Sequence, residues 1–185
     1  MSKEKTLTRK NIFNGRIIKL DVHEVMLENQ RTAEREVITH QGGVGVIPIT
    51  DADEIVFVKQ FRKPFECETL EIPAGKKEKN EEPQSCAERE LKEETGITAR
   101  HITFLTDIYP SPGYTDEIVY IYKAEGLTYG DMSTDEDEFI QVFKYPIEEA
   151  VLMVKSGQIK DAKTIIAIMM VANEMLIQNH GQIRK

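Results

Sequence analysis

The chain has 185 residues and a formal net charge of −8, and 30% of its residues are charged. This length suits one domain with small additions. The negative charge argues against a nucleic-acid partner, because phosphate contacts require a basic surface. No apolar run approaches the ~20 residues of a membrane span, and the first residues lack the apolar stretch of a signal peptide. We therefore expect a cytoplasmic protein that binds neither membranes nor nucleic acids.

Five segments in the first half of the chain have the alternation or the β-branched content of strands. They cover residues 16–26, 34–40, 44–50, 54–61 and 68–72. Only Asp51-Ala52-Asp53 separates the third segment from the fourth, which predicts that these two strands pair as a β-hairpin.

A helix is predicted at residues 83–95 from the residues at its two ends. Pro83 fits the first helical position, where its missing N–H has no partner to lose. Gly96 fits the position just after the helix, where a left-handed conformation is cheap only for glycine.

The second half of the chain continues the mixture of strands and helices. Strands are predicted at residues 101–109, 117–124 and 140–144, and an acidic loop at residues 126–138. Helices are predicted at residues 146–155 and 161–178, with Asp161 as the N-cap of the second. Together these elements predict an α/β fold, with helices packed on both faces of a mixed β-sheet in an α/β/α sandwich.

Three glutamates on the helix at residues 83–95 carry the main chemical signal. Glu90, Glu93 and Glu94 stand at positions i, i+3 and i+4, so they share one helix face. Like charges at these spacings repel by about 0.2–0.5 kcal/mol per pair. A divalent cation removes this repulsion, and Mg²⁺ commonly takes one or two carboxylates together with a substrate phosphate. The three glutamates alone would also suit a solvated helix face, so the flanking residues decide.

The flanking residues complete a longer motif. It runs Gly75, five residues, Glu81, seven residues, Arg89-Glu90-Leu91, one residue, Glu93-Glu94, one residue, Gly96-Ile97. The seven fixed residues of this motif, which are those other than the apolar Leu91 and Ile97, would coincide by chance on the order of once in 10⁵ such chains. The chain therefore resembles the Nudix hydrolase superfamily, whose members hydrolyse nucleoside diphosphates linked to another group.

The resemblance implies a Nudix fold with a divalent-metal site. Residues 75–97 would form its loop–helix–loop, and the ion would be Mg²⁺ or Mn²⁺. Hydrogen bonds and charge pairing by Arg89 and Glu81 would steady this loop–helix–loop. The implied metal ligands are Glu90, Glu93, Glu94 and the backbone carbonyl of Ala74.

A narrower resemblance is to the ADP-ribose pyrophosphatase subfamily, which has a proline sixteen residues beyond the last glycine of the motif. Here Pro112 stands sixteen residues beyond Gly96, and Gly113 follows it. This resemblance implies that Arg62 lies near the substrate and that Arg35 and Glu36 contact its adenosine end. The implied substrate-binding residues are thus Arg62, Arg35, Glu36, Pro112 and Gly113.

The same subfamily resemblance implies a homodimer. Residues 1–40 would form an N-terminal strand segment that makes the dimer, and residues 41–185 would form the Nudix hydrolase domain. Because this N-terminal segment crosses the two-fold axis in the subfamily, Arg35 would serve the active site of the partner.

The general base of the subfamily is a glutamate on a mobile loop near the C-terminal strand. The corresponding loop here is residues 131–139, which contains Asp135-Glu136-Asp137-Glu138. We predict Glu138 as the base, with Glu136 as the second choice. Glu93 is a third choice, if the metal ions draw the attacking water toward it.

The expected reaction is the Mg²⁺-dependent hydrolysis of ADP-ribose, a small nucleotide substrate, to AMP and ribose 5-phosphate. One alternative keeps the chemistry and changes the substrate to another nucleotide sugar or a dinucleotide. A second alternative is a Nudix module that binds ADP-ribose without cleaving it, and the complete motif argues against that reading.

Overall fold

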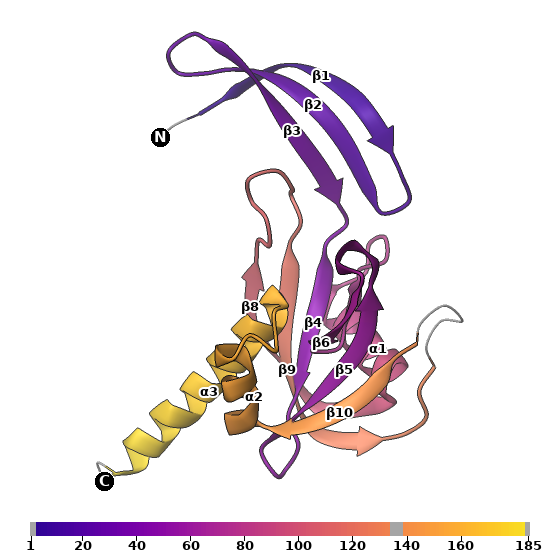
Figure 1. Ribbon diagram of the computed structural model, residues 1–185, viewed down its shortest axis with the longest axis vertical. Helices are drawn as coiled ribbons and strands as arrows, with labels where there is room; N and C mark the ends of the chain where they lie inside the picture. Colours follow the sequence, from indigo (N-terminus) through magenta and orange to yellow (C-terminus); the bar gives the residue numbers. More distant parts are fainter. Residues whose placement is uncertain (1–2, 134–138, 184–185) are drawn as a thin grey trace. The chain divides into compact units, whose positions relative to one another are not determined.

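The computed structural model describes residues 3–133 and 139–183, and the chain divides into two compact units. The first unit combines residues 1–42 with residues 109–118, and the second combines residues 43–108 with residues 119–185. The division after residue 40 stays a prediction about domain organisation, and the structure adds the segment 109–118 to the N-terminal unit. Figure 1 labels the elements of both units.

The first unit contains a three-stranded antiparallel sheet of β1 (Lys5–Asn14), β2 (Ile18–Met26) and β3 (Thr32–His40). Strands β2 and β3 match predicted segments, whereas β1 was not predicted. Every residue of β1 is exposed, so no buried face imposes an apolar alternation on its sequence. What makes this segment a strand is the pairing of its backbone with β2.

The segment 109–118 joins the first unit by hydrogen bonds to the end of β3. The Ile38 N–H donates to the Tyr114 carbonyl at 2.7 Å, and the Asp116 N–H donates to the Ile38 carbonyl at 3.1 Å. The Asp116 carboxylate in turn accepts the His40 N–H at 2.9 Å. The predicted turn around Pro112 is therefore fixed to the strand that carries Arg35 and Glu36.

The second unit contains two sheets. A four-stranded mixed sheet has the order β7-β4-β9-β8, and a three-stranded antiparallel sheet has the order β10-β5-β6. Their strands are β4 (Gly43–Pro48), β5 (Glu54–Arg62), β6 (Cys67–Glu71), β7 (Ala74–Lys76), β8 (Ile97–Ile108), β9 (Val119–Tyr129) and β10 (Gln141–Pro146).

The hairpin predicted for the third and fourth segments is wrong. Strands β4 and β5 belong to different sheets, and an isolated antiparallel bridge links Ile49, just after β4, to Ile55 near the start of β5. All six residues of β4 are buried, and its two edges pair with β7 and with β9. Both partners are distant in sequence, so local spacing could not predict them.

The acidic loop predicted at residues 126–138 is also partly wrong, because β9 continues to Tyr129. Strand β8 is correspondingly longer than predicted and begins directly after Gly96, with Ile97 paired to Tyr129. Residues near this end of β9 are polar and partly exposed, so they resemble a loop in sequence while the pairing with β8 keeps them extended.

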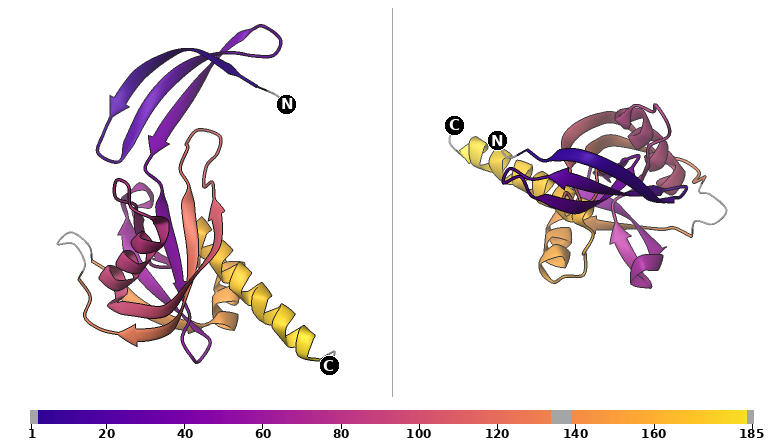
Figure 2. Two further views of the ribbon diagram at one scale, coloured as in Figure 1. Left: turned by 180° about the vertical axis from the view of Figure 1, so that it is seen from behind. Right: turned by 90° about the horizontal axis from the view of Figure 1, so that it is seen from above.

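The helices are α1 (Pro83–Thr95), α2 (Ile147–Lys155) and α3 (Ala162–Ile183), with a short 3₁₀ turn at Lys63–Phe65. Figures 1 and 2 show α1 on one side of the strands of the second unit and α2 and α3 on the other. Side chains of β5 alternate between these layers: Val56 packs in the α1 core, whereas Ile55 and Phe57 pack in the α2–α3 core. This arrangement confirms the predicted α/β/α sandwich.

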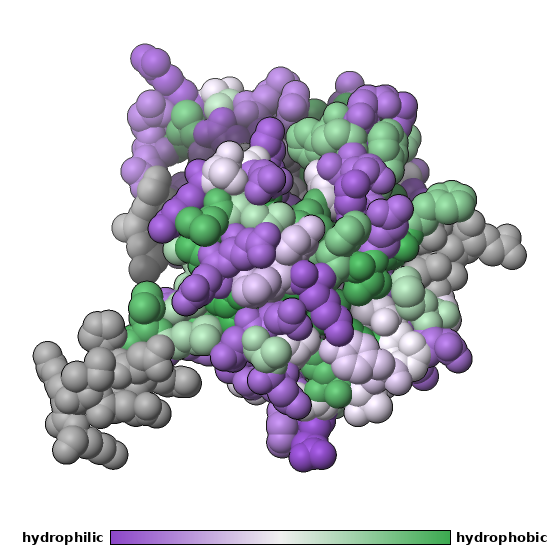
Figure 3. Space-filling model, turned by 60° about the horizontal axis from the view of Figure 1, so that its bottom comes forward, coloured by the Kyte–Doolittle hydropathy of each residue, from purple (hydrophilic) through white to green (hydrophobic). Residues whose placement is uncertain are grey.

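The surface gives no sign of a membrane span within the described residues. None of the helices in residues 3–133 and 139–183 has the length and apolar character that crossing a bilayer requires. On the face that Figure 3 shows, hydrophobic residues lie scattered among hydrophilic ones.

Candidate active site

Helix α1 is placed by its ends and by its buried face. Pro83 occupies the start of the helix, and Gly96 ends it with φ +69°, as the sequence predicts. A Cβ at Gly96 would lie 2.3 Å from the Gly130 carbonyl oxygen, so glycine is required there by space as well as by conformation. Cys86 and Leu91 are buried against the sheet. The opposite face is thereby left to carry polar side chains.

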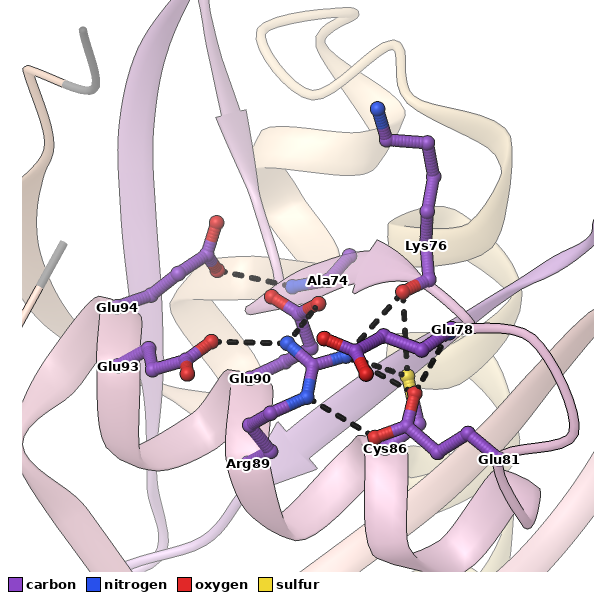
Figure 4. A network of polar contacts seen from close by, with 9 residues as sticks. All are labelled: Ala74, Lys76, Glu78, Glu81, Cys86, Arg89, Glu90, Glu93 and Glu94. Carbon is purple, nitrogen blue, oxygen red and sulfur yellow. Dashed lines mark hydrogen bonds and ion pairs between the residues drawn. The ribbon is translucent and has the colours of Figure 1, made fainter. Parts of the chain in front are cut away.

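The Arg89 guanidinium is the centre of a polar network on that face (Figure 4). It donates two hydrogen bonds to the Glu81 carboxylate, at 2.9 and 3.0 Å. Its Nη1 donates to Glu90 at 2.8 Å and to Glu93 at 2.9 Å, and its Nη2 donates to the Lys76 carbonyl at 3.2 Å. The predicted steadying role of Arg89 and Glu81 is confirmed, because one cation links the preceding loop to the helix.

Arg89 also sets the charge state of its partner in the loop. Its hydrogen bonds hold the pKa of Glu81 at about 2, against an ordinary 4.5, although the partial burial of this carboxyl acts in the opposite direction. Glu81 therefore stays ionised at neutral pH and keeps the loop pinned to α1.

The remaining side chains of the cluster lie against the β7 backbone. The Glu94 side chain accepts the Ala74 N–H at 2.9 Å, and Glu94 is only 3% exposed. The Glu90 carboxylate lies over Gly75, where any Cβ would come within 1.9 to 2.2 Å of its atoms. The structure thus explains the glycine of the motif, since a larger residue would displace the Glu90 carboxylate.

The cluster has the donors that a hard divalent cation takes. It brings three carboxylates and the backbone of Ala74 to one end of α1 and β7 (Figure 4), and Mg²⁺ and Mn²⁺ favour oxygen ligands. In the described part of the chain, no three acidic, histidine or cysteine side chains converge as they would around an ion. Two of these carboxylates instead point to the Arg89 guanidinium. The residue types fit a divalent cation, while Glu90 and Glu93 are here bound to the Arg89 guanidinium and Glu94 to the Ala74 N–H.

A second charged network surrounds Glu71, which the sequence analysis does not identify as a site residue. Arg62 donates to both Glu71 oxygens at 2.7 Å, and Lys163 donates to one of them. The Glu71 side chain is 3% exposed. The signal in the sequence is a single charge between two apolar residues that enter the core, Leu70-Glu71-Ile72. Such a residue is rarely buried without partners.

The start of α3 completes this network. The Asp161 carboxylate accepts the Thr164 N–H at 3.0 Å, which confirms Asp161 as the predicted N-cap. It also pairs with Lys163 at 3.0 Å. The Thr164 hydroxyl accepts the Ile72 N–H at 2.9 Å in a buried position. The beginning of α3 is therefore bound to the backbone directly after Glu71.

Comparison with known proteins identifies the family. A family model described as a NUDIX domain matches residues 39–167, which is more than half of the chain. The chain belongs to the Nudix family. The Nudix fold is also found in a crystal structure described as an ADP compounds hydrolase, with a TM-score of 0.86, 22% identity and coverage of 95% of this chain and 96% of that one.

Two curated relatives match nearly the whole Nudix chain. The ADP-ribose pyrophosphatase of Bacillus subtilis is 47% identical over 167 residues, which cover 89% of this chain and 90% of the relative. A protein of Bacillus methanolicus named methanol dehydrogenase activator is 44% identical over 167 residues, with the same coverage. Nudix enzymes generally use divalent metal ions, which agrees with the carboxylate cluster on α1.

The other predicted site residues of this Nudix chain lie in three places. Arg62 ends β5 in the second unit, bound to Glu71. In the first unit, Arg35 pairs with Glu4 at 2.6 Å, and the loop with Pro112 and Gly113 contacts β3. The predicted bases Glu136 and Glu138 lie outside the described residues.

The buried carboxylate of Glu71 leads to a pH-dependent stability. Burial would raise its pKa, but hydrogen bonds and charges from Arg62 and Lys163 lower it from 4.5 to about 2. Because the pKa is lower in the folded state, the stabilisation is complete above pH 4.5 and is lost as the pH falls toward 2. Glu71→Gln should therefore lower the free energy of unfolding at pH 7 by on the order of 3 kcal/mol.

Urea unfolding at several pH values between 7 and 3 measures this effect. The gap between wild type and Glu71→Gln should narrow as the pH falls below about 4.5. Glu68→Gln is the matched control, because Glu68 lies on the same strand with an exposed side chain paired to Lys59, and such pairs are worth ~0–1 kcal/mol. A gap for Glu71→Gln that stays constant down to pH 3 would contradict the assignment.

Proposed function

We propose that this protein hydrolyses the diphosphate bond of ADP-ribose to AMP and ribose 5-phosphate, in the cytoplasm and with divalent metal ions. The observation that carries the proposal is the complete Nudix motif, folded with its glutamates on one face of α1. The substrate is supported by the 47% identity to the Bacillus subtilis ADP-ribose pyrophosphatase over 89% of the chain.

Four groups would hold the metal, which we propose to be Mg²⁺ with Mn²⁺ as a substitute. They are the carboxylates of Glu90, Glu93 and Glu94 and the carbonyl of Ala74. Bound there, the ion would neutralise the diphosphate oxygens and acidify the attacking water. The fold orients these carboxylates: Arg89 donates hydrogen bonds to Glu90 and Glu93, and the Ala74 N–H donates to Glu94.

Arg62 is the residue we assign to the diphosphate of the substrate. Its side chain is 38% exposed, and a guanidinium presents a planar set of donors that suits phosphate oxygens. The hydrogen bonds that Arg62 donates to the Glu71 carboxylate raise the pKa of Arg62, and the charges of Glu94 and Asp161 raise it further. Arg62 is therefore always charged and lies within electrostatic range of a proposed metal ligand.

Glu138 is the proposed general base, followed by Glu136 and Glu93. The chain just before this acidic segment is fixed to the end of α1, because the Ser133 N–H donates to the Glu93 carbonyl at 3.1 Å. Glu136 follows Ser133 by three residues and Glu138 by five, so both proposed bases stand close in sequence to a residue that is bound to the helix of the proposed metal ligands.

The remaining substrate contacts and the homodimer are assigned to the first unit. We propose that Arg35, Glu36, Pro112 and Gly113 contact the adenosine end and that the N-terminal strands form the dimer. Support comes from exposed hydrophobic side chains on these strands and the turn between them: Leu7, Ile12, Phe13 and Ile17.

Sedimentation equilibrium should therefore give twice the 21.2 kDa chain mass. A monomer at micromolar concentration would refute the dimer.

The second relative leaves room for an alternative substrate, because its name describes an effect on another enzyme and does not mention ADP-ribose. The same metal chemistry would then act on a different nucleoside diphosphate derivative. A panel of ADP-ribose, ADP-mannose, GDP-mannose and a dinucleotide, assayed with Mg²⁺, separates the two proposals. We expect the highest kcat/KM for ADP-ribose, with AMP and ribose 5-phosphate as products. A higher kcat/KM for another member of the panel would make that compound the substrate instead of ADP-ribose.

Substitution of single glutamates tests the metal and base assignments. Glu94→Gln keeps an oxygen that can accept the Ala74 N–H and loses the charge, so kcat should fall roughly 10²-fold or more. Glu138→Gln should lower kcat by ~10²–10⁴-fold, the usual contribution of a general base.

The matched control is Glu88→Gln, because Glu88 is an exposed glutamate on the same helix, bound to Gln84. It should keep wild-type turnover. Steady-state rates at saturating Mg²⁺, together with circular dichroism of each variant, give the readout. A folded Glu94→Gln variant with wild-type kcat would remove Glu94 from the ligand set. A wild-type protein that binds ADP-ribose tightly and does not cleave it would favour a binding module.

A further inference from the structure

We propose that Glu71 is a positioning residue of the hydrolysis reaction, which holds the Arg62 guanidinium for the substrate and ties it to the backbone that leads to Ala74. This inference rests on the proposed function, because Arg62 is assigned there to the diphosphate. Glu71 itself is buried and is not proposed to touch the substrate.

The geometry of the pair fixes the orientation of the guanidinium. Arg62 Nε donates to Glu71 Oε1 and Arg62 Nη2 donates to Oε2, both at 2.7 Å. Two parallel hydrogen bonds hold the guanidinium plane as well as its position. Among the residues that the structure describes, no hydrogen bond to Arg62 Nη1 is found, so its donors stay available to a ligand.

Both oxygens of the Glu71 carboxylate have a further hydrogen-bond donor. Oε1 also accepts a hydrogen bond from the Thr69 hydroxyl at 2.6 Å, and Oε2 also accepts one from the Lys163 ammonium group. The carboxylate is thus fully bonded, which a buried charge requires. Because Lys163 is shared with Asp161 at 3.0 Å, Glu71 is not neutralised by Lys163 alone, and its second cation is Arg62.

The same residue is linked through the backbone to the proposed metal site. Directly after it, Ile72 N–H is bound by Thr164 at 2.9 Å, and the Pro73 carbonyl accepts the Val46 N–H at 2.8 Å. The next residue is Ala74, whose N–H is bound by Glu94. The side chain that binds Arg62 and the backbone N–H that Glu94 accepts therefore belong to one continuous four-residue segment, Glu71 to Ala74.

An ordinary buried ion pair that serves stability alone makes a different prediction. Its loss would lower the free energy of unfolding and would leave kcat/KM near the wild-type value while the variant is folded. A residue that acts through Arg62 should lower kcat/KM of the folded protein, and this effect should disappear once Arg62 is gone. A loss of kcat/KM in the folded variant that depends on Arg62 therefore separates the two roles.

The experiment is a double-mutant cycle on kcat/KM with wild type, Glu71→Gln, Arg62→Gln and the double variant. The substrate is whichever member of the nucleotide panel wild type cleaves fastest. Glu71→Gln alone should lower kcat/KM by about 10–100-fold, the usual cost of losing a residue that orients an active-site group. In the Arg62→Gln background, adding Glu71→Gln should lower kcat/KM by less than about threefold. Glu68→Gln is the control on the same strand and should match wild type.

An equal loss from Glu71→Gln in both backgrounds, or no loss in either, overturns the proposal. Each variant is assayed well below its measured melting temperature. If Glu71→Gln does not fold, Thr69→Val replaces it in the same cycle, because it removes one hydrogen bond to the Glu71 carboxylate and keeps the charge.

The outcome is also distinguishable from failure of the proposed function. If wild type prefers another substrate, the ADP-ribose assignment fails while the cycle still runs on that substrate. If wild type cleaves no member of the panel, the cycle runs on the dissociation constant for ADP-ribose by calorimetry. The same coupling supports the role of Glu71 in holding Arg62, and its absence overturns it.

Discussion

Mutual repulsion of the carboxylates on one face of α1 is the constraint on which the rest of the structure depends. Arg89 offsets this repulsion, because its Nη1 donates to both Glu90 and Glu93 while its other donors bind Glu81 and the Lys76 carbonyl at the end of β7. The loop, the helix and the carboxylates are therefore organised by one internal cation. A divalent ion bound by the same carboxylates would have to draw Glu90 and Glu93 away from Arg89, while the helix keeps them on one face.

The Glu71 network extends this organisation to a second layer. Glu71 lies three residues before Ala74 in the chain, and it connects the end of β5 with the start of α3 through Arg62 and Lys163. Glu94 reaches the same segment from α1. Elements that are far apart in the sequence thus converge on residues 71–75, and this convergence joins the proposed diphosphate-binding arginine to the helix that carries the proposed metal ligands.

The sequence predicted most where the physical signal is local. Pro83 and Gly96 bound α1 as expected, and the spacing of the glutamates placed them on one face. Prediction failed where exposure leaves no apolar alternation, as in β1, and where the cause is distant in the chain, as in β4, whose partners lie beyond residue 70. Glu71 went unassigned for the same reason, because its partner Lys163 lies 92 residues away. Glu136 and Glu138 stay predictions.

The most direct measurement of the central claim is a crystal structure with Mn²⁺ and a non-hydrolysable ADP-ribose analogue, in which anomalous scattering locates each metal ion. The account predicts anomalous peaks about 2.0–2.3 Å from oxygens of Glu90, Glu93 or Glu94, with the diphosphate bridging those ions and Arg62. Analogue bound with no metal at these carboxylates, or metal gathered at a different acidic cluster, would contradict it.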